Sequence, residues 1–235
     1  MRKFNIIAVL ILLLLLIQNL TLTYGQESNP DRYEKYIQET FEQADKTNFP
    51  QKGVIVFTGS SSIKLWNTLT EDFIPFNVIN RGFGGSQLSD VIYFADRIII
   101  KYNPSMVVLY CGENDIAVGK TPERVFIDFK KLINHIHKSL PNTIILYIPC
   151  KPSIRRWEMR NNMNKINRLI EDYIKKDKLV EFVDVRPAML GKDGKPNPDI
   201  FVEDNLHMNA KGYSLWTPHV RDYILKHISV HGTVQ

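Results

Sequence analysis

Residues 54–63 read VIVFTGSSSI, an apolar run rich in β-branched side chains that stops at a glycine and three serines. A short run of this kind, closed by turn formers, predicts a buried β-strand over residues 54–58. Four further runs share this character, at residues 77–80, 106–110, 143–148 and 181–185. We therefore expect five strands.

The segments between these strands have helical periodicity. Thr121-Pro122 predicts the cap and first residue of a helix, and apolar residues then recur every three or four positions up to residue 140. The same period occurs over residues 33–44, 88–99 and 163–173, and Asn209 and Thr217-Pro218 predict the starts of two late helices. Because each parallel crossover needs a helix, this alternation predicts an α/β fold, a three-layer α/β/α sandwich with a five-stranded parallel sheet.

The first 25 residues have the pattern of an export signal. Arg2 and Lys3 precede an apolar core, and small residues follow up to Gly25. We expect a signal peptide over residues 1–25, cleaved near Gly25-Gln26, and a single exported domain over residues 26–235 with no stable membrane insertion. The alternative is an uncleaved anchor, although the apolar core falls short of the ~20 residues needed to span a bilayer.

Charge and cysteine content exclude some classes of function. The net charge is only +5, and the basic residues are spread along the chain, so we expect no nucleic-acid partner. Cys111 and Cys150 each end an apolar run. A disulfide is one option in an exported protein, but neighbouring parallel strands rarely offer the required geometry, which favours two buried thiols.

Polar blocks follow the predicted strands. Ligands of parallel α/β sheets bind at the carboxyl ends of the strands, so these blocks are the candidate site. Their sequences are TGSSS at residues 58–62, NRGFGGS at 80–86, CGEND at 111–115 and, late in the chain, DNLH at 204–207.

Taken in order, these four blocks resemble those of the SGNH hydrolases, the GDSL-type esterase/lipase family, and the resemblance covers roughly residues 54–220. The chain departs from the usual Gly-Asp-Ser-Leu, because Ser60 and Ser62 replace the aspartate and the leucine. It is similar to a subgroup with a Gly-Ser-Ser-Ser-Ile run. The resemblance implies the flavodoxin-like fold of SGNH hydrolases.

The resemblance also implies the residues of a catalytic site. It places the nucleophile on Ser61, with Ser60 as the alternative, and the base and its orienting carboxylate on His207 and Asp204. A serine hydroxyl needs such a base to remove its proton. Taken alone, His207 and Asp204 would be a helix cap and a turn residue.

An oxyanion hole is implied at the backbone N–H groups of Ser61 and Gly85 and the side-chain amide of Asn114. Trp66, Arg155, Arg156 and Trp157 are either substrate-cleft residues or packing and surface residues. Asp115 is expected to anchor its loop.

We expect no metal and no cofactor. His135 and His137 are two residues apart on a predicted helix and do not face the same way. Residues 82–85 lack the spacing of a dinucleotide-binding loop.

The implied activity is hydrolysis of carboxylic esters through an acyl-enzyme. We expect a short acyl ester, such as an acetyl group on a glycan, because no apolar lid segment is evident. The alternatives are a lysophospholipase or other lipid acylhydrolase and, in another class, a secreted glycan-binding module without catalysis. The sequence does not indicate an oligomeric state.

Overall fold

The computed structural model describes residues 27–231, with side chains up to His227. The predicted signal peptide and its cleavage site lie outside the described residues.

A five-stranded parallel sheet forms the centre of the molecule, with strand order β2-β1-β3-β4-β5. The strands are β1 (Ile55–Gly59), β2 (Val78–Gly82), β3 (Met106–Tyr110), β4 (Ile144–Tyr147) and β5 (Val180–Phe182). The bounds of β1 to β4 lie within two residues of the predicted runs, and β5 ends three residues before its predicted run does. The order is that of flavodoxin-like folds, so the predicted fold class is confirmed.

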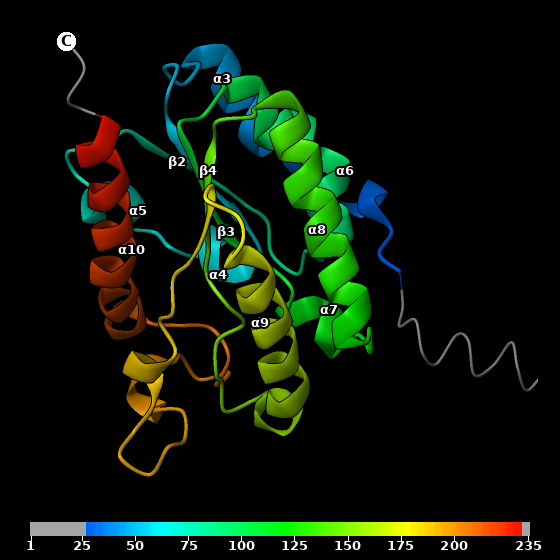
Figure 1. Ribbon diagram of the computed structural model, residues 1–235, viewed down its shortest axis with the longest axis vertical. Helices are drawn as coiled ribbons and strands as arrows, with labels where there is room; N and C mark the ends of the chain where they lie inside the picture. The colour runs from blue at the N-terminus through cyan, green and yellow to red at the C-terminus, as the bar shows by residue number, and fades with distance from the viewer. Residues whose placement is uncertain (1–26, 232–235) are drawn as a thin grey trace, which may run out of the picture.

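Helices cover both faces of this sheet (Figure 1). One face carries α6 (Leu88–Ile98), α8 (Pro122–Ser139), α9 (Arg160–Ile174) and the N-terminal helical segment of residues 30–47. The other face carries α4 (Ser61–Lys64), α5 (Leu69–Asp72) and α10 (Ala210–His231). The short helix α7 (Glu113–Ala117) follows β3, and 3-10 turns occupy Ile100–Tyr102, Trp157–Met159, Pro187–Met189 and Pro198–Ile200.

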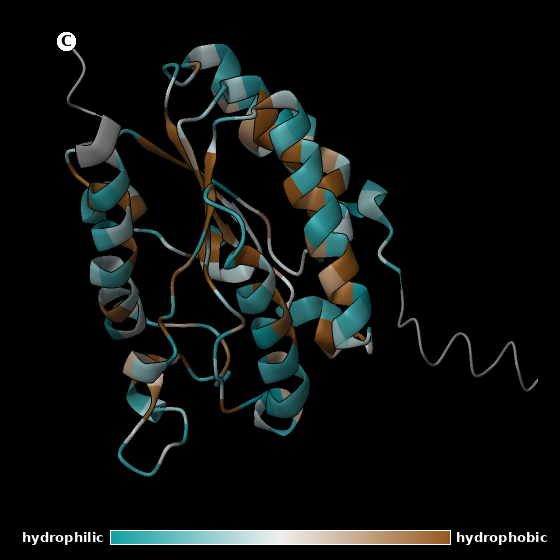
Figure 2. Cartoon of the chain, in the orientation of Figure 1, coloured by the Kyte–Doolittle hydropathy of each residue, from teal (hydrophilic) through white to brown (hydrophobic). Residues whose placement is uncertain are grey.

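Two hydrophobic cores hold these layers together. Along β3, Val107 and Leu109 pack into the core under α6 and α8, whereas Val108 and Tyr110 pack into the core under α10. This alternation follows from the two-residue period of a strand, and it explains why β3, buried on both faces, is apolar throughout. Figure 2 shows hydrophobic residues along the strands and hydrophilic residues on the outer sides of the helices.

Two helical predictions differ from the structure. The periodic segment of residues 33–44 is helical but irregular, since 3-10, α and π turns succeed one another over Pro30–Tyr33, Glu34–Tyr36, Ile37–Glu42 and Gln43–Thr47. The predicted break at Thr217-Pro218 is wrong, because Pro218 lies inside α10. Trp216 and Val220 are fully buried on either side of it, and this packing keeps the helix continuous.

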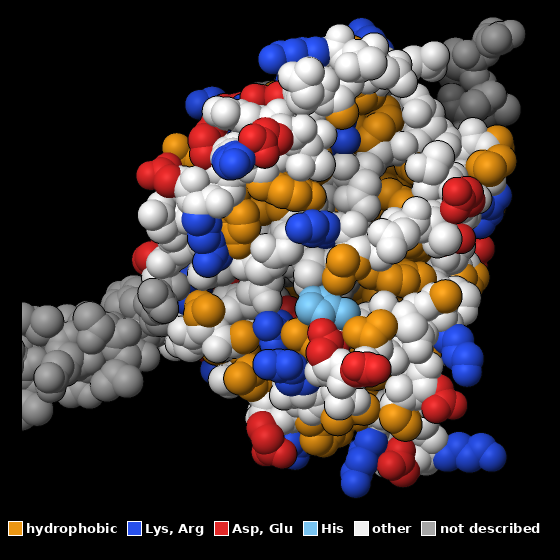
Figure 3. Space-filling view, turned by 180° about the vertical axis from the view of Figure 1, so that it is seen from behind, with side chains coloured by type: hydrophobic (Ala, Val, Ile, Leu, Met, Phe, Trp, Pro, Cys, Tyr) orange, Lys and Arg blue, Asp and Glu red, His pale blue; other side chains and the backbone are white. Residues whose placement is uncertain are grey.

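The surface and the thiols agree with the sequence-based expectations. Cys111 and Cys150 are buried free thiols. Basic and acidic side chains are interspersed over the face seen from behind (Figure 3). Within residues 27–231, no helix combines the length and apolarity needed to cross a bilayer.

Candidate active site

The chain turns sharply where β1 meets α4. Gly59 has φ +119°, and a Cβ at this position would lie 1.9 Å from the carbonyl oxygen of Tyr110. Only glycine fits this close approach. The turn places Ser61 at the start of α4, just past the carboxyl end of β1.

The three serines of this turn have different surroundings. Ser60 and Ser62 are each 2% exposed, whereas Ser61 is half-buried. The Oγ of Ser61 lies 3.0 Å from Nε2 of His207. Among the described residues, neither Ser60 nor Ser62 forms a hydrogen bond with a histidine, so the geometry favours Ser61 over the alternative Ser60.

Asp204 fixes the orientation of His207. Its Oδ2 lies 2.5 Å from Nδ1 of His207, and its Oδ1 accepts from the backbone N–H groups of Leu206 and His207, both at 2.9 Å. Because a carboxylate only accepts, Nδ1 carries the proton, and Nε2 of the neutral ring accepts from the Ser61 hydroxyl. Burial raises the pKa of Asp204, but these hydrogen bonds outweigh it and lower the pKa to about 2.

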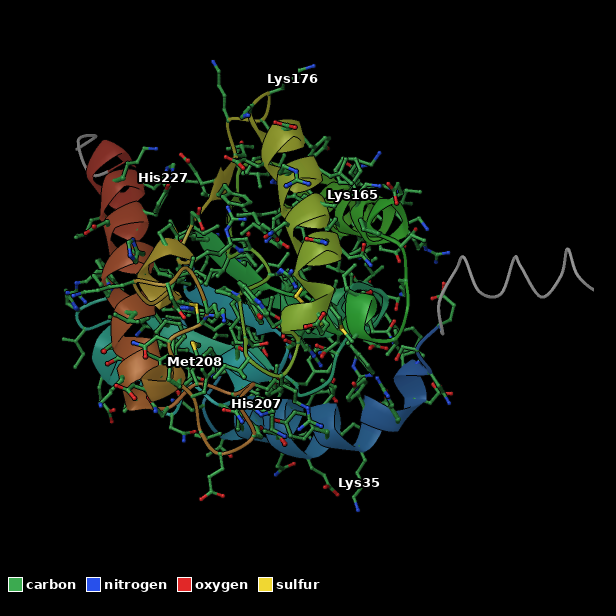
Figure 4. All side chains as sticks on the ribbon, turned by 90° about the horizontal axis from the view of Figure 1, so that it is seen from below. Lys35, Lys165, Lys176, His207, Met208 and His227 are labelled. Atoms are coloured by element: carbon green, nitrogen blue, oxygen red, sulfur yellow. The ribbon has the colours of Figure 1, made fainter. Side chains whose placement is uncertain are left out.

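The loop that carries this pair is itself anchored. Phe201 and Met208 form an antiparallel bridge, and the Val202 N–H donates to the His207 carbonyl at 2.9 Å. Figure 4 shows His207 and Met208 on this loop, with the N-terminal helical segment that carries Lys35 at the same end of the molecule.

The N-terminal helical segment also contacts the groups around Ser61. Arg32 donates to the Gly85 carbonyl at 3.4 Å, and Nζ of Lys64 lies 4.5 Å from the Tyr36 ring centre. The segment therefore flanks the candidate site.

Gly85 and Asn114 are the other predicted site residues near Ser61 and His207. Gly85 has φ +79° and Asn114 is the second residue of α7. Ser61, Gly85, Asn114 and His207 line one cavity of about 330 Å³. Among the described residues, the backbone N–H groups of Ser61 and Gly85 donate to no other group, which leaves them free for a ligand oxygen.

Arg156 holds the Asn114 amide in place, and the sequence did not single out this role. Nη2 of Arg156 donates to Oδ1 of Asn114 at 3.0 Å, and Nδ2 of Asn114 donates to the Ser86 carbonyl at 3.0 Å. The oxygen of the amide is therefore engaged by a cation, and the second proton on Nδ2 is not used by Ser86.

Arg156 is in turn held by a buried carboxylate. Glu113, 3% exposed, accepts from Nη1 of Arg156 at 2.9 Å, from Nζ of Lys151 at 3.1 Å and from the Tyr110 hydroxyl. Burial raises the pKa of Glu113. The positive charges of Lys151 and Arg156 have the larger combined effect, so the pKa lies below its usual value. Glu113 stands in the third sequence block, yet its two cationic partners lie 38 and 43 residues away, and no local pattern connects them with it.

The structure corrects part of the predicted substrate cleft. Trp66 is 1% exposed and packs against Phe73 and Trp216, so it is a core residue and lines no cleft. Arg155 is exposed and does not line the Ser61 cavity. It also does not line a second cavity, which lies between the loop after β4, the start of α9 and the loop after β5. Trp157 is half-buried and lines that second cavity.

The remaining polar candidates have structural partners. Asp115 is buried and accepts from the Leu88 N–H and from Nζ of Lys120, as expected of a loop anchor. His135 contacts Asp96, and His137 contacts the Thr143 carbonyl. No group of three or more potential metal ligands occurs in the part of the chain that the structure describes.

Comparisons with solved structures show what the fold is similar to. A protein from Streptococcus pneumonia named as a platelet activating factor is 19% identical, with a TM-score of 0.72 over 94% of this chain and 99% of that chain. A GDSL-like lipase from Bacteroides thetaiotaomicron is 22% identical, with a TM-score of 0.65 over 85% and 98%. A carbohydrate esterase family 3 protein from Talaromyces cellulolyticus is 16% identical, with a TM-score of 0.60 over 75% and 98%.

No curated protein sequence matches this chain. Residues 22–215, most of its length, match the sequence pattern of the GDSL-like Lipase/Acylhydrolase family. Together with the five-stranded parallel sheet, this match shows that the chain belongs to the GDSL-like lipase/acylhydrolase family.

Proposed function

We propose that this protein is a serine esterase that hydrolyses carboxylic esters through an acyl-enzyme on Ser61. The observation that carries the proposal is the hydrogen-bonded series from Ser61 Oγ to His207 Nε2 and from His207 Nδ1 to Asp204. It lies beside the two free N–H groups and the amide of Asn114.

The chemistry follows from these contacts. Nε2 of His207 takes the hydroxyl proton as Ser61 Oγ attacks the ester carbonyl, and Asp204 stabilises the imidazolium. The negative charge on the carbonyl oxygen is met by the N–H groups of Ser61 and Gly85 and the Asn114 amide. The alcohol leaves with the proton from His207. Water, deprotonated by His207, then releases the acid and restores Ser61.

We propose a short acyl group, such as an acetyl group on a glycan, as the substrate. The Ser61 cavity has a volume of about 330 Å³, at the small end of ligand pockets. Structures of similar fold include a carbohydrate esterase and an acetyl esterase. We also propose that residues 1–25 direct export, which would bring the enzyme to such glycans.

The test is hydrolysis of p-nitrophenyl acetate by the purified protein. Ser61→Ala and His207→Ala are each expected to lower kcat by on the order of 10³-fold or more. Ser60→Ala is the matched control from the same turn and should keep most of the activity. Equal rates for all these proteins would refute the esterase and favour a binding module.

A series of p-nitrophenyl esters from two to twelve carbons tests the acyl preference. We expect kcat/KM to be highest for the shortest chains. A maximum at eight carbons or more would favour the lipid acylhydrolase instead.

A further inference from the structure

A second cavity adjoins the Ser61 cavity. It has a volume of about 300 Å³ and lies between the loop after β4, the start of α9 and the loop after β5. Arg156 lines both cavities, so this side chain forms the boundary between them. A substrate that has its ester at Ser61 and reaches past Arg156 would enter the second cavity.

The wall of the second cavity is rich in cations. Lys151, Arg156, Arg160 and Arg186 line it, together with a single carboxylate, Asp184. Four positive side chains against one negative side chain give this wall a clear excess of positive charge.

The ion pairs around the cavity leave positive charge uncompensated. Arg186 binds Asp184 through two hydrogen bonds of 2.7 and 2.9 Å. Lys151 and Arg156 share one carboxylate, that of Glu113, which lies behind the wall. Three cations are thus matched by two carboxylates.

Arg160 has no carboxylate partner among the described residues. It donates to the Trp157 carbonyl at 3.1 Å, and its guanidinium carbon lies 5.1 Å from the centre of the Trp157 ring. A carbonyl and an aromatic face hold a guanidinium in place without neutralising it. Arg160 is therefore preorganised to bind an anion.

The other side chains of the wall favour an organic anion. Trp157, Met163 and Leu190 provide apolar surface. Ser153 is 1% exposed, and its hydroxyl has no hydrogen-bond partner in the described part of the chain. An apolar wall with an unused hydroxyl and an unpaired guanidinium suits a carboxylate carried on a carbon skeleton.

We propose that this second cavity binds a carboxylate on the part of the substrate that does not react, so that the preferred substrate is an acidic ester. The inference rests on the proposed esterase function and names its substrate class. A guanidinium in a partly enclosed, apolar setting binds a carboxylate more strongly than one in open solvent. The Arg160 interaction therefore provides specificity beyond the ester itself.

Two pairs of chromogenic or acid-releasing esters test the proposal. 3-Acetoxybenzoate and its methyl ester place the carboxylate on the alcohol half, and 4-nitrophenyl hydrogen glutarate and its methyl ester place it on the acyl half. We expect kcat/KM of the acid to exceed that of its neutral partner by about 10-fold in at least one pair, and the ratio to decline as salt rises. Arg160→Gln should bring this ratio close to one.

The matched control is Arg168→Gln, which removes the same charge from an exposed position on the same helix, outside both cavities. It should leave the ratio of acid to neutral ester unchanged. Equal kcat/KM within both pairs, or a preference that survives Arg160→Gln, would overturn the proposal while the esterase itself stands.

A binding measurement separates the two proposals if no ester is hydrolysed. The Ser61→Ala protein is titrated calorimetrically with 3-acetamidobenzoate, with glutaric acid monoanilide and with the methyl esters of both amides. We expect one free acid to bind about 10-fold more tightly than its methyl ester. Acids that bind no better than their methyl esters overturn the second cavity as an anion site, whatever the result for turnover.

Discussion

At the level of single residues, the Asn114 amide depends on a neighbour that does not touch the Ser61 hydroxyl. Arg156 donates to the amide oxygen, and Glu113 anchors Arg156 from behind. The amide is thereby oriented before any ester binds, and such preorganisation is the source of oxyanion stabilisation.

Replacement of Arg156 should therefore impair turnover more than binding. Arg156→Gln removes the donor to Asn114 and leaves Glu113 with Lys151 as its one cation among the described residues. We expect kcat for p-nitrophenyl acetate to fall about 10- to 100-fold, less than on loss of the amide in Asn114→Ala, with KM changed by less than about 3-fold. Arg155→Gln is the control from the neighbouring, exposed position. A selective rise in KM would contradict this positioning role.

Asp204 links the site to acid stability. Its pKa is lowered to about 2, from ~3.9 in an unfolded chain. Because the folded value is the lower one, the ionised carboxylate stabilises the fold above about pH 4, and this contribution is lost as the pH falls toward 2. The difference in unfolding free energy between the wild type and Asp204→Asn should shrink as the pH falls from 4 toward 2.

Urea unfolding at a series of pH values measures this difference. Glu203→Gln, at the exposed neighbouring position, should show a much smaller change with pH. A difference for Asp204→Asn that grows on acidification would contradict the assigned cause.

Several of these residues could be predicted from the sequence, and others could not. Three residues of the site, Ser61, Gly85 and Asn114, come shortly after predicted strands, and parallel strands bring their carboxyl ends together. His207 belongs to the last of the four sequence blocks, residues 204–207. The Arg156–Glu113 contact depends on the path of the loop after β4, which has no periodic pattern. For Trp66 the sequence left a cleft role and a packing role open, because an isolated aromatic residue gives no sign of which way its side chain points, and the structure places it in the core.

At the level of helices and strands, α10 shows the limits of local signals. Asn209 accepts from the N–H groups of Lys211 and Gly212 at 2.9 and 3.2 Å, so the predicted cap is confirmed. Pro218 was a misleading signal, because the burial of Trp216 and Val220 outweighs the missing N–H. Strands were easier to predict, since β3 and β4 are apolar throughout and turn formers follow them.

Loss of the Asn209 cap should destabilise the protein measurably. Asn209→Ala removes the acceptor for two N–H groups, and we expect the free energy of unfolding to fall by about 1 kcal/mol. Asn209→Asp keeps the acceptor and should lose less. Thermal or urea unfolding of the three proteins tests this, and an Asn209→Ala protein as stable as the wild type would show that the cap contributes nothing.

At the level of the whole molecule, the hydrophobic core under α10 lies directly behind the turn that carries Ser61. The core under α10 contains Trp66, Tyr213 and Trp216, and the Tyr213 hydroxyl donates to the Ser62 carbonyl at 3.0 Å. This core supports the turn that carries Ser61 without lining the cavity.

Trp66 should therefore affect stability and not substrate affinity. Trp66→Ala opens a large cavity in the core, with an expected loss of about 3 to 5 kcal/mol in unfolding free energy, while KM for p-nitrophenyl acetate at 10 °C stays near the wild-type value. Trp157→Ala, on the wall of the second cavity, should change KM and cause little loss of unfolding free energy. A large KM change for Trp66→Ala in the folded protein would contradict the purely structural role of Trp66.

The proposal that Ser61 is the nucleophile is tested most directly by covalent trapping. The protein is treated with a p-nitrophenyl phosphonate ester, digested, and analysed by tandem mass spectrometry, with His207→Ala as the control. We predict one phosphonyl adduct, located on Ser61 and absent or greatly reduced in the control. An adduct on Ser60 or Ser62, or a folded protein that forms none, would contradict the mechanism.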